Sequence, residues 1–232
     1  MAKDIKNLIG WLKGNKQRDE ARIVITGGRT SIDESYNRLK DNILYFGAEG
    51  KKIIQVESTI SGEGKTSVVC NLAVSLSYNH KKVLVIDLDF RDPGIEKVFG
   101  IKEKTGLSDC ILDGINLEEI ITTTDLGVDV ITVGREIHNS SYVLDSKKFA
   151  EIIANLKEKY DFILLDCPPV LLASDYLHIA KFSDGILYVV SANFVKKTAV
   201  RESLGLLSKL NVPVLGGVMT SVAKSGASNC KK

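Results

Sequence analysis

One short glycine-bearing segment carries the residues best suited to chemistry. Residues 58–67 read Ser-Thr-Ile-Ser-Gly-Glu-Gly-Lys-Thr-Ser, between the apolar run 53–56 and a helix-like stretch, 68–77. In a strand–loop–helix setting, loop amides and a helix N-terminus cradle phosphate. A lysine there reaches the β- and γ-phosphates, and a threonine hydroxyl ligates Mg²⁺. The segment therefore predicts binding of a nucleoside triphosphate, with Lys65 and Thr66 in those two roles.

The alternative is a plain glycine turn with a solvent-exposed lysine. The full pattern has glycine five residues before Gly64, where this chain has Thr59. We expect that departure to affect loop geometry more than phosphate chemistry, because Lys65 and Thr66 are intact. The residues that we predict to bind the nucleotide are Ser61, Gly62, Glu63, Gly64, Lys65, Thr66 and Ser67.

Aspartates end two other apolar runs. Residues 83–89 read Val-Leu-Val-Ile-Asp-Leu-Asp, and residues 162–166 read Phe-Ile-Leu-Leu-Asp. Beside a phosphate loop, a carboxylate at the end of a buried strand holds Mg²⁺ or its waters. The spacing places Asp87 and Asp89 on one face if the strand continues that far. The alternative is that Asp87, Asp89 and Asp166 cap helices or turns.

Alternating strands and helices must position these residues. Short apolar, β-branched runs predict strands at 53–57, 83–87, 128–133, 162–166, 186–191 and 214–219. Helical spacing predicts helices at 34–46, 66–79, 146–159, 174–182 and 197–210, with short helices in 94–124 and an edge strand at 22–26. The alternation predicts an α/β fold with a mostly parallel sheet and helices on both faces, whose ligands bind at the carboxyl ends of the strands.

Composition narrows the classes of function. The 232 residues carry a net charge of +2, which indicates no strong nucleic-acid-binding signature. The apolar runs are short, so we expect neither a membrane span nor a secretory signal. The cysteines show no paired short spacing, which predicts reduced thiols, and Cys70 and Cys167 are expected to be small buried residues. The histidines are scattered and indicate no metal cluster.

Two stretches, one amphipathic and one basic, can each be interpreted either as a binding surface or as an ordinary part of the fold. Residues 3–14 carry apolar side chains at helical spacing among lysines. That helix could dock on a membrane adaptor or an anionic membrane surface, or it could pack on its own domain. Lys196, Lys197 and Arg201 could line a phosphate or acidic-partner surface, or they could be a solvated helix start.

The motifs together resemble those of the bacterial tyrosine kinases of capsule and exopolysaccharide systems. Residues 61–66, Asp87-Leu88-Asp89-Phe90-Arg91 and Asp166-Cys167-Pro168-Pro169 are similar to that family's Walker A, A′ and B motifs. The resemblance spans roughly residues 30–220. Further similar segments stand in the expected order at 34–36, 104–109, 160–162 and 212–216.

The resemblance implies a P-loop NTPase fold and an ATP- and Mg²⁺-dependent kinase that phosphorylates protein tyrosines, including its own, and regulates polysaccharide production. Lys65 would hold phosphates, Thr66, Asp87 and Asp166 would organise the metal, and Asp89 would orient or deprotonate the tyrosine hydroxyl. Catalysis would then rest on Asp89, Asp87 and Lys65. The family also implies a cytoplasmic protein, held at the inner membrane face by a membrane adaptor, that can form a homo-oligomer.

The chain departs from the family pattern at three places. Its last tyrosine is Tyr188, so the tail 222–232 lacks the usual tyrosine cluster and self-phosphorylation there is in doubt. The oligomerisation motif Glu-x-x-Arg-x-x-Arg reads Glu-x-x-Asn-x-x-Lys at 34–40, which weakens ring assembly because asparagine carries no charge and lysine lacks the arginine fork. Thr-Ser at 220–221 stands where an asparagine often meets the base.

Two other functions stay open. One is a ParA/MinD-like ATPase switch, which shares the fold but has an additional early lysine that this loop lacks before Lys65. The other is a nucleotide-binding regulator without kinase activity, which is consistent with the lack of a tyrosine cluster in residues 222–232. We expect an N-terminal amphipathic segment and linker at 1–21, a P-loop kinase domain at 22–221 and a flexible tail at 222–232.

Overall fold

The computed structural model describes residue 23 and residues 30–102, 104–192 and 194–222. Strands and helices alternate along this part of the chain. The strands are β1 (Ile53–Ser58), β2 (Val83–Asp87), β3 (Thr122–Thr123), β4 (Asp129–Ile131), β5 (Phe162–Asp166), β6 (Gly185–Ser191) and β7 (Val214–Thr220). The helices are α2 (Ser31–Ala48), α3 (Lys65–Tyr78), α4 (Ile95–Phe99), α5 (Leu107–Asp113), the 3-10 helix η1 (Leu117–Ile120), α6 (Ser140–Leu144), α7 (Lys147–Lys159), α8 (Asp175–Ile179) and α9 (Lys197–Leu207).

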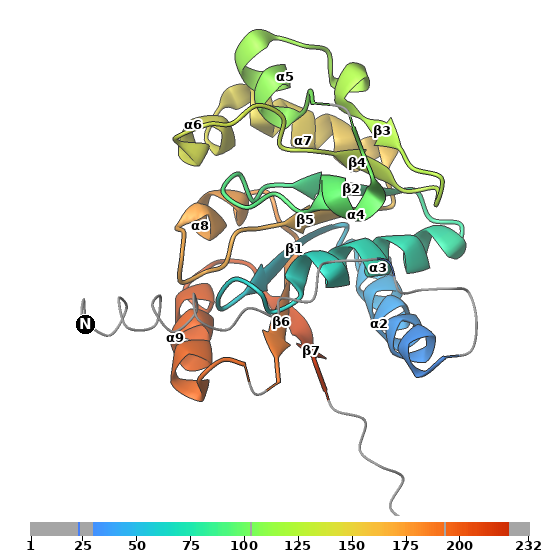
Figure 1. Cartoon of the computed structure of the whole chain (residues 1–232), viewed down its shortest axis with the longest axis vertical. Coiled ribbons are helices and arrows are strands. Elements are labelled where there is room, and N and C mark those ends of the chain that lie inside the picture. The colour runs from blue at the N-terminus through green and yellow to red at the C-terminus, as the bar shows by residue number, and fades with distance from the viewer. Residues whose placement is uncertain (1–22, 24–29, 103, 193, 223–232) are drawn as a thin grey trace, which may run out of the picture.

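The strands form one sheet in the order β3-β4-β2-β5-β1-β6-β7. Every neighbouring pair is parallel except β3 and β4, which are antiparallel. The sheet runs through the middle of the molecule, with α2 and α3 over one face and α7 over the other (Figure 1). The predicted α/β fold with a mostly parallel sheet is confirmed.

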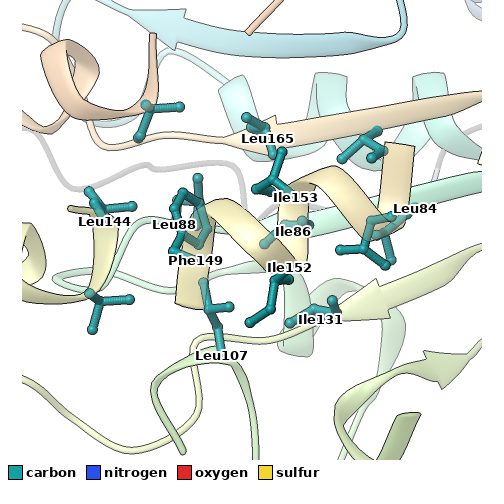
Figure 2. Close-up of a cluster of buried hydrophobic side chains, with 14 of the residues drawn as sticks. Leu84, Ile86, Leu88, Leu107, Ile131, Leu144, Phe149, Ile152, Ile153 and Leu165 are labelled. Carbon is teal, nitrogen blue, oxygen red and sulfur yellow. The ribbon is translucent and has the colours of Figure 1, made fainter. Parts of the chain in front are cut away.

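Each central strand is buried on both faces because its side chains alternate between two cores. In β2, Leu84 and Ile86 enter the core under α7, whereas Val83 and Val85 enter the core under α2 and α3. Figure 2 shows Phe149, Ile152 and Ile153 of α7 gathered with Ile86 and other strand side chains. A strand whose residues are all apolar therefore packs against apolar side chains on both faces of the sheet.

All six strands predicted between 53 and 219 are present, as are the five predicted helices and the short helices in 94–124. Helix α2 begins at Ser31 because Thr30 and Asp33 form a reciprocal capping box. Strand β4 is shorter than predicted, since the carbonyl groups of Thr132 and Val133 accept hydrogen bonds from the start of α5. Helix α8 is also shorter than expected, and both β3 and α6 were not predicted.

Several expectations concern residues that the structure does not describe. The helix over 3–14, the linker and the tail beyond Val222 lie outside the described residues, as does the edge strand at 22–26 except for Ile23. Cys70 and Cys167 are buried, as predicted. Across the described ranges, we find no helix with the length and apolar character needed to cross a membrane.

Candidate active site

The phosphate-loop segment connects β1 to α3, as the sequence predicts. Gly62 and Gly64 have φ angles of 89° and 87°, which side chains with a Cβ rarely adopt. The loop forms one wall of a cleft of about 540 Å³. From the loop region, Ser58, Ser61, Gly62, Gly64, Lys65, Thr66 and Ser67 line this cleft.

Glu63 is the predicted loop residue whose side chain turns inward. Its Oε2 accepts a hydrogen bond from the amide of Ile60 at 2.8 Å, and its Oε1 accepts one from the amide of Ser191 at 3.2 Å. Thr220 Oγ1 donates to the carbonyl oxygen of Glu63 at 2.7 Å. Glu63 therefore ties the phosphate loop to the ends of β6 and β7, and burial raises the pKa of its carboxyl group.

The position where glycine is replaced by Thr59 lies inside the fold. The Thr59 side chain is fully buried, and its hydroxyl shares a 2.7 Å hydrogen bond with Tyr188 Oη. The substitution therefore adds a contact between the loop and β6. Lys65 and Thr66 still line the cleft.

Asp166 joins the two chemically important residues of the loop. Lys65 Nζ donates to Asp166 Oδ1 at 2.5 Å, and Thr66 Oγ1 donates to Asp166 Oδ2 at 2.8 Å. Burial alone would lower the pKa of Lys65, but the carboxylates of Asp166 and Asp89 outweigh it and raise the pKa above its usual value. The lysine is therefore a firmly charged cation at the carboxyl end of the sheet.

The parallel register brings together acids that lie far apart in the sequence. Strand β5 runs between β1 and β2, and Asp166 is in register with Val56 on one side and with Asp87 on the other. All three strands end at the same edge of the sheet. Asp87, Asp166 and the loop therefore meet there, as expected for carboxyl ends of parallel strands.

Asp89 is a second carboxylate near the lysine, and it lines the cleft. Its Oδ2 lies 4.0 Å from Lys65 Nζ, and its Oδ1 accepts a hydrogen bond from the amide of Asp92 at 3.2 Å. Only 7% of the Asp89 surface is exposed. Burial raises the pKa of Asp89, while Lys65 opposes that rise. A carboxylate of increased basicity thus faces the cleft beside the phosphate loop.

Asp87 makes contacts of a different kind. Its Oδ1 accepts a hydrogen bond from the amide of Asp89 at 3.0 Å, and its Oδ2 accepts bonds from the amides of Gly94 and Ile95, both at 3.1 Å. Burial and the neighbouring Asp166 raise its pKa to about 8. These bonds fit the alternative in which Asp87 caps a turn or helix. Its carboxylate holds the turn that carries Asp89 and the backbone at the start of α4. Its role as a metal ligand stays a prediction.

The contact made by Arg91 and several residues that line the cleft beyond the loop were not predicted from the sequence. Arg91 donates to Asp175 Oδ2 at 2.8 Å and to Oδ1 at 3.5 Å, which joins the turn after β2 to the start of α8. The arginine stands in the A′ motif, but nothing in the sequence indicates a partner 84 residues away. Beyond the loop, Asp89, Asp92, Pro93, Gly94, Lys97, Val98 and Pro169 complete the lining.

The basic residues at the start of α9 are exposed, and the cleft lining does not include Lys196, Lys197 or Arg201. In the altered oligomerisation motif, Lys40 Nζ donates to Asn37 Oδ1 within α2 at 3.4 Å. None of these five side chains is among the residues that line the cleft.

Comparisons with known proteins agree with this geometry. The AAA domain family matches residues 51–204. The putative tyrosine-protein kinase CapB of Staphylococcus aureus is 31% identical over 196 residues, which cover 84% of this chain and 86% of CapB. The crystal structure of the chimerical protein CapA2B2 has a TM-score of 0.79 at 28% identity, over 82% of this chain and 85% of that one.

A more distant structural likeness shows how widely the fold is shared. The septum site-determining protein MinD from Pyrococcus horikoshii, complexed with Mg-ADP, has a TM-score of 0.62 at 29% identity, over 72% of this chain and 69% of MinD. The likeness to MinD establishes a P-loop NTPase fold of the nucleotide-binding type. The match to the AAA domain family and the identity with CapB over most of both chains go further: this protein belongs to the family of bacterial tyrosine-protein kinases.

Proposed function

We propose that this protein is an ATP- and Mg²⁺-dependent protein tyrosine kinase that regulates capsular or exopolysaccharide biosynthesis. The observation that carries the proposal is the pair formed by Lys65 and Asp89, 4.0 Å apart in one cleft with the phosphate loop. A phosphate-binding cation and a carboxylate suited to a hydroxyl acceptor are the parts that phosphoryl transfer needs.

The residues present fit a nucleotide and its metal. Gly62 and Gly64 adopt the backbone conformation that lets loop amides face a phosphate. The oxygens of Thr66 and Asp166 lie 2.8 Å apart and are of the kind that Mg²⁺ prefers. ATP would supply the phosphoryl group, and Mg²⁺ would offset part of its charge.

The chain's own side chains would then have distinct tasks. Lys65 would offset negative charge on the phosphates. Asp89 would accept the proton of the tyrosine hydroxyl while the phenolic oxygen bonds to phosphorus and ADP departs. Burial raises the pKa of Asp89, which strengthens it as a base. Asp87 would hold the turn that presents Asp89, and its assigned role at the metal is part of this proposal.

The acceptors would be other proteins or tyrosines within the described chain. Residues 222–232 contain no tyrosine. Among the described tyrosines, Tyr45, Tyr78 and Tyr142 are exposed at 65%, 50% and 70%. We infer weak self-labelling at such positions and stronger transfer to partner proteins.

We also propose activation by a membrane adaptor that holds the protein at the cytoplasmic face. The likeness to the chimerical protein CapA2B2 supports an adaptor. The segment 1–21 is our proposed contact for the adaptor or the membrane surface. A ring through residues 34–40 would be weaker than in the family, because the motif has lost both arginines.

A phosphotyrosine immunoblot after incubation with ATP and Mg²⁺ tests the proposal. The full chain is incubated with a tyrosine-rich peptide, with and without the adaptor's cytoplasmic segment. We expect labelled peptide from the natural protein, none from Asp89→Asn, and near-normal labelling from Asp125→Asn, which removes an exposed carboxylate outside the cleft. Inorganic phosphate with no phosphotyrosine in any arm would favour an ATPase switch, the alternative that the MinD likeness supports.

A further inference from the structure

The cleft extends well beyond the phosphate loop. Its far part is formed by the turn after β2, by α4 and by Pro169. Pro93 and Val98 contribute apolar surface there, and Asp89 lines the same cleft with its Oδ2 4.0 Å from Lys65 Nζ. An apolar compartment that opens onto a candidate base suits an aromatic ring that carries a hydroxyl group.

Lys97 places a positive charge without a paired carboxylate, among the described residues, in the lining of this cleft. The cationic side chains that line the cleft are Lys65 and Lys97. Lys65 is paired with Asp166, and the nearby Arg91 and Arg135 are paired with Asp175 and Asp113. Lys97 is exposed and has no ion pair among the described residues.

The position of Lys97 is set by buried contacts. The carboxylate of Asp87 accepts hydrogen bonds from the amides of Gly94 and Ile95, which fixes the start of α4. Gly94 packs so tightly against Thr66 that an added Cβ would come within 3.1 Å of Thr66 Cγ2. Lys97 follows Gly94 by three residues and therefore projects from the same side of α4. Lys97 thus lines the cleft about one helical turn along the chain from the residue that packs against Thr66.

We propose that this compartment binds the acceptor tyrosine and that Lys97 selects acceptor segments with a carboxylate close to that tyrosine. The inference rests on the proposed kinase function and names its substrate class. The ring would lie against Pro93, Val98 and Pro169, with its hydroxyl toward Asp89. Asp89 and Asp92 are balanced in the cleft lining by Lys65 and Lys97, so without Lys97 the lining would carry a net negative charge that repels an acidic acceptor.

Paired peptides test the selection directly. Two peptides share one tyrosine and differ only in having glutamate or glutamine on either side of it. For the full chain with ATP and Mg²⁺, we expect kcat/KM to favour the glutamate peptide about two- to fivefold, the range for a partly exposed ion pair. The preference disappears in Lys97→Gln and shrinks as salt is added. Lys104→Gln, which removes an exposed charge outside the cleft, keeps it.

A binding measurement tests the role of Lys97 independently of the proposed kinase activity. Fluorescence anisotropy of the labelled peptides is measured without nucleotide, using the same three proteins. We expect tighter binding of the glutamate peptide by the natural chain and by Lys104→Gln, but not by Lys97→Gln. If neither peptide is phosphorylated, the kinase proposal fails, and the anisotropy still decides whether Lys97 recognises acidic segments.

Any one of three results would overturn the inference. One is an unchanged preference for the glutamate peptide in Lys97→Gln. A second is a Lys97→Gln variant that raises the KM for ATP and slows both peptides by the same factor, because Lys97 would then act on the nucleotide. A charge reversal, Lys97→Glu, should favour a lysine-flanked peptide, and a continued preference for glutamate in that variant would also contradict the proposal.

Discussion

Lys65 Nζ and Asp166 Oδ1 lie 2.5 Å apart, although 101 residues separate them along the chain. The same carboxylate accepts a hydrogen bond from Thr66 through its second oxygen. One aspartate thereby holds both the predicted phosphate-binding cation and the predicted metal-binding hydroxyl. Both side chains would redirect these contacts when a nucleotide enters, and substitutions at each partner should separate binding from turnover.

Lys65→Met should weaken ATP binding and abolish turnover while the domain still folds. Among the loop side chains it is the only cation, and the β- and γ-phosphates carry concentrated negative charge. Isothermal titration and a phosphate-release assay measure the two effects, with circular dichroism as the check on folding. Lys197→Met, at an exposed position outside the cleft, serves as control. Undiminished turnover in a folded Lys65→Met protein would contradict the role of the loop.

Asp166→Asn should reduce activity far more than nucleotide affinity. The loop amides and Lys65 would still contact phosphates, whereas an amide is a poorer Mg²⁺ ligand than a carboxylate. A titration of activity against Mg²⁺, beside the ATP dissociation constant, tests this difference. The natural protein should be inactive in EDTA. Full activity of the variant, or activity of the natural chain in EDTA, would rule out the metal assignment.

Asp89→Asn should lower tyrosine phosphorylation about 10²- to 10⁴-fold, the usual contribution of a general base. ATP binding should be retained, since the Asp89 carboxylate lies 4.0 Å from the lysine and the loop amides are unaffected. In the natural protein, the rate should rise with pH through the pKa of Asp89, which burial places above its ordinary value. A variant with the same rate and pH profile would exclude Asp89 as the base.

Glu63→Ala should destabilise the protein and loosen the phosphate loop. The change leaves the buried amides of Ile60 and Ser191 without their acceptor, and each such loss costs about 1–3 kcal/mol. Chemical denaturation should show a lower free energy of unfolding, together with weaker ATP binding. Glu158→Ala, at an exposed position of α7, should change neither quantity. Equal stability of the two variants would show that Glu63 does not brace the loop.

Glu57 should make folding stability fall as pH rises from about 4.5 to about 8. The side chain is fully buried, its Oε2 has no hydrogen-bond partner among the residues that the structure describes, and burial raises its pKa from 4.5 to about 8. Between these pH values the folded state therefore keeps a proton that the unfolded state has released. The free energy of unfolding falls as a result, by at most about 1.4 kcal/mol per pH unit.

Glu57→Gln tests this pH dependence because glutamine cannot ionise. Free energies of unfolding measured across pH 5 to 8 should fall less steeply in the variant. Part of the slope should persist, since the pKa of Asp87 is raised in the same direction. An identical slope in both proteins would show that Glu57 does not hold a proton in the folded state.

The sequence by itself determined the fold class, every described strand except β3, and the residue types of the site. Apolar runs such as 83–87 and 162–166 are unambiguous because strands buried on both faces need continuous apolar character. The glycines around Lys65 and the aspartates at strand ends indicate phosphate and metal chemistry, because few other sites place those groups between a strand and a helix.

Only the tertiary structure decided which of these groups touch. The parallel register sets Asp166 against Lys65, and the turn after β2 uses Asp87 to hold backbone amides rather than leaving it free in the cleft. The inward direction of Glu63 and the exposure of Lys97 in the cleft follow from packing between segments that lie far apart in sequence. Local patterns carry no information about such partners, because a side chain's hydrogen bonds depend on which remote backbone groups the fold brings within reach.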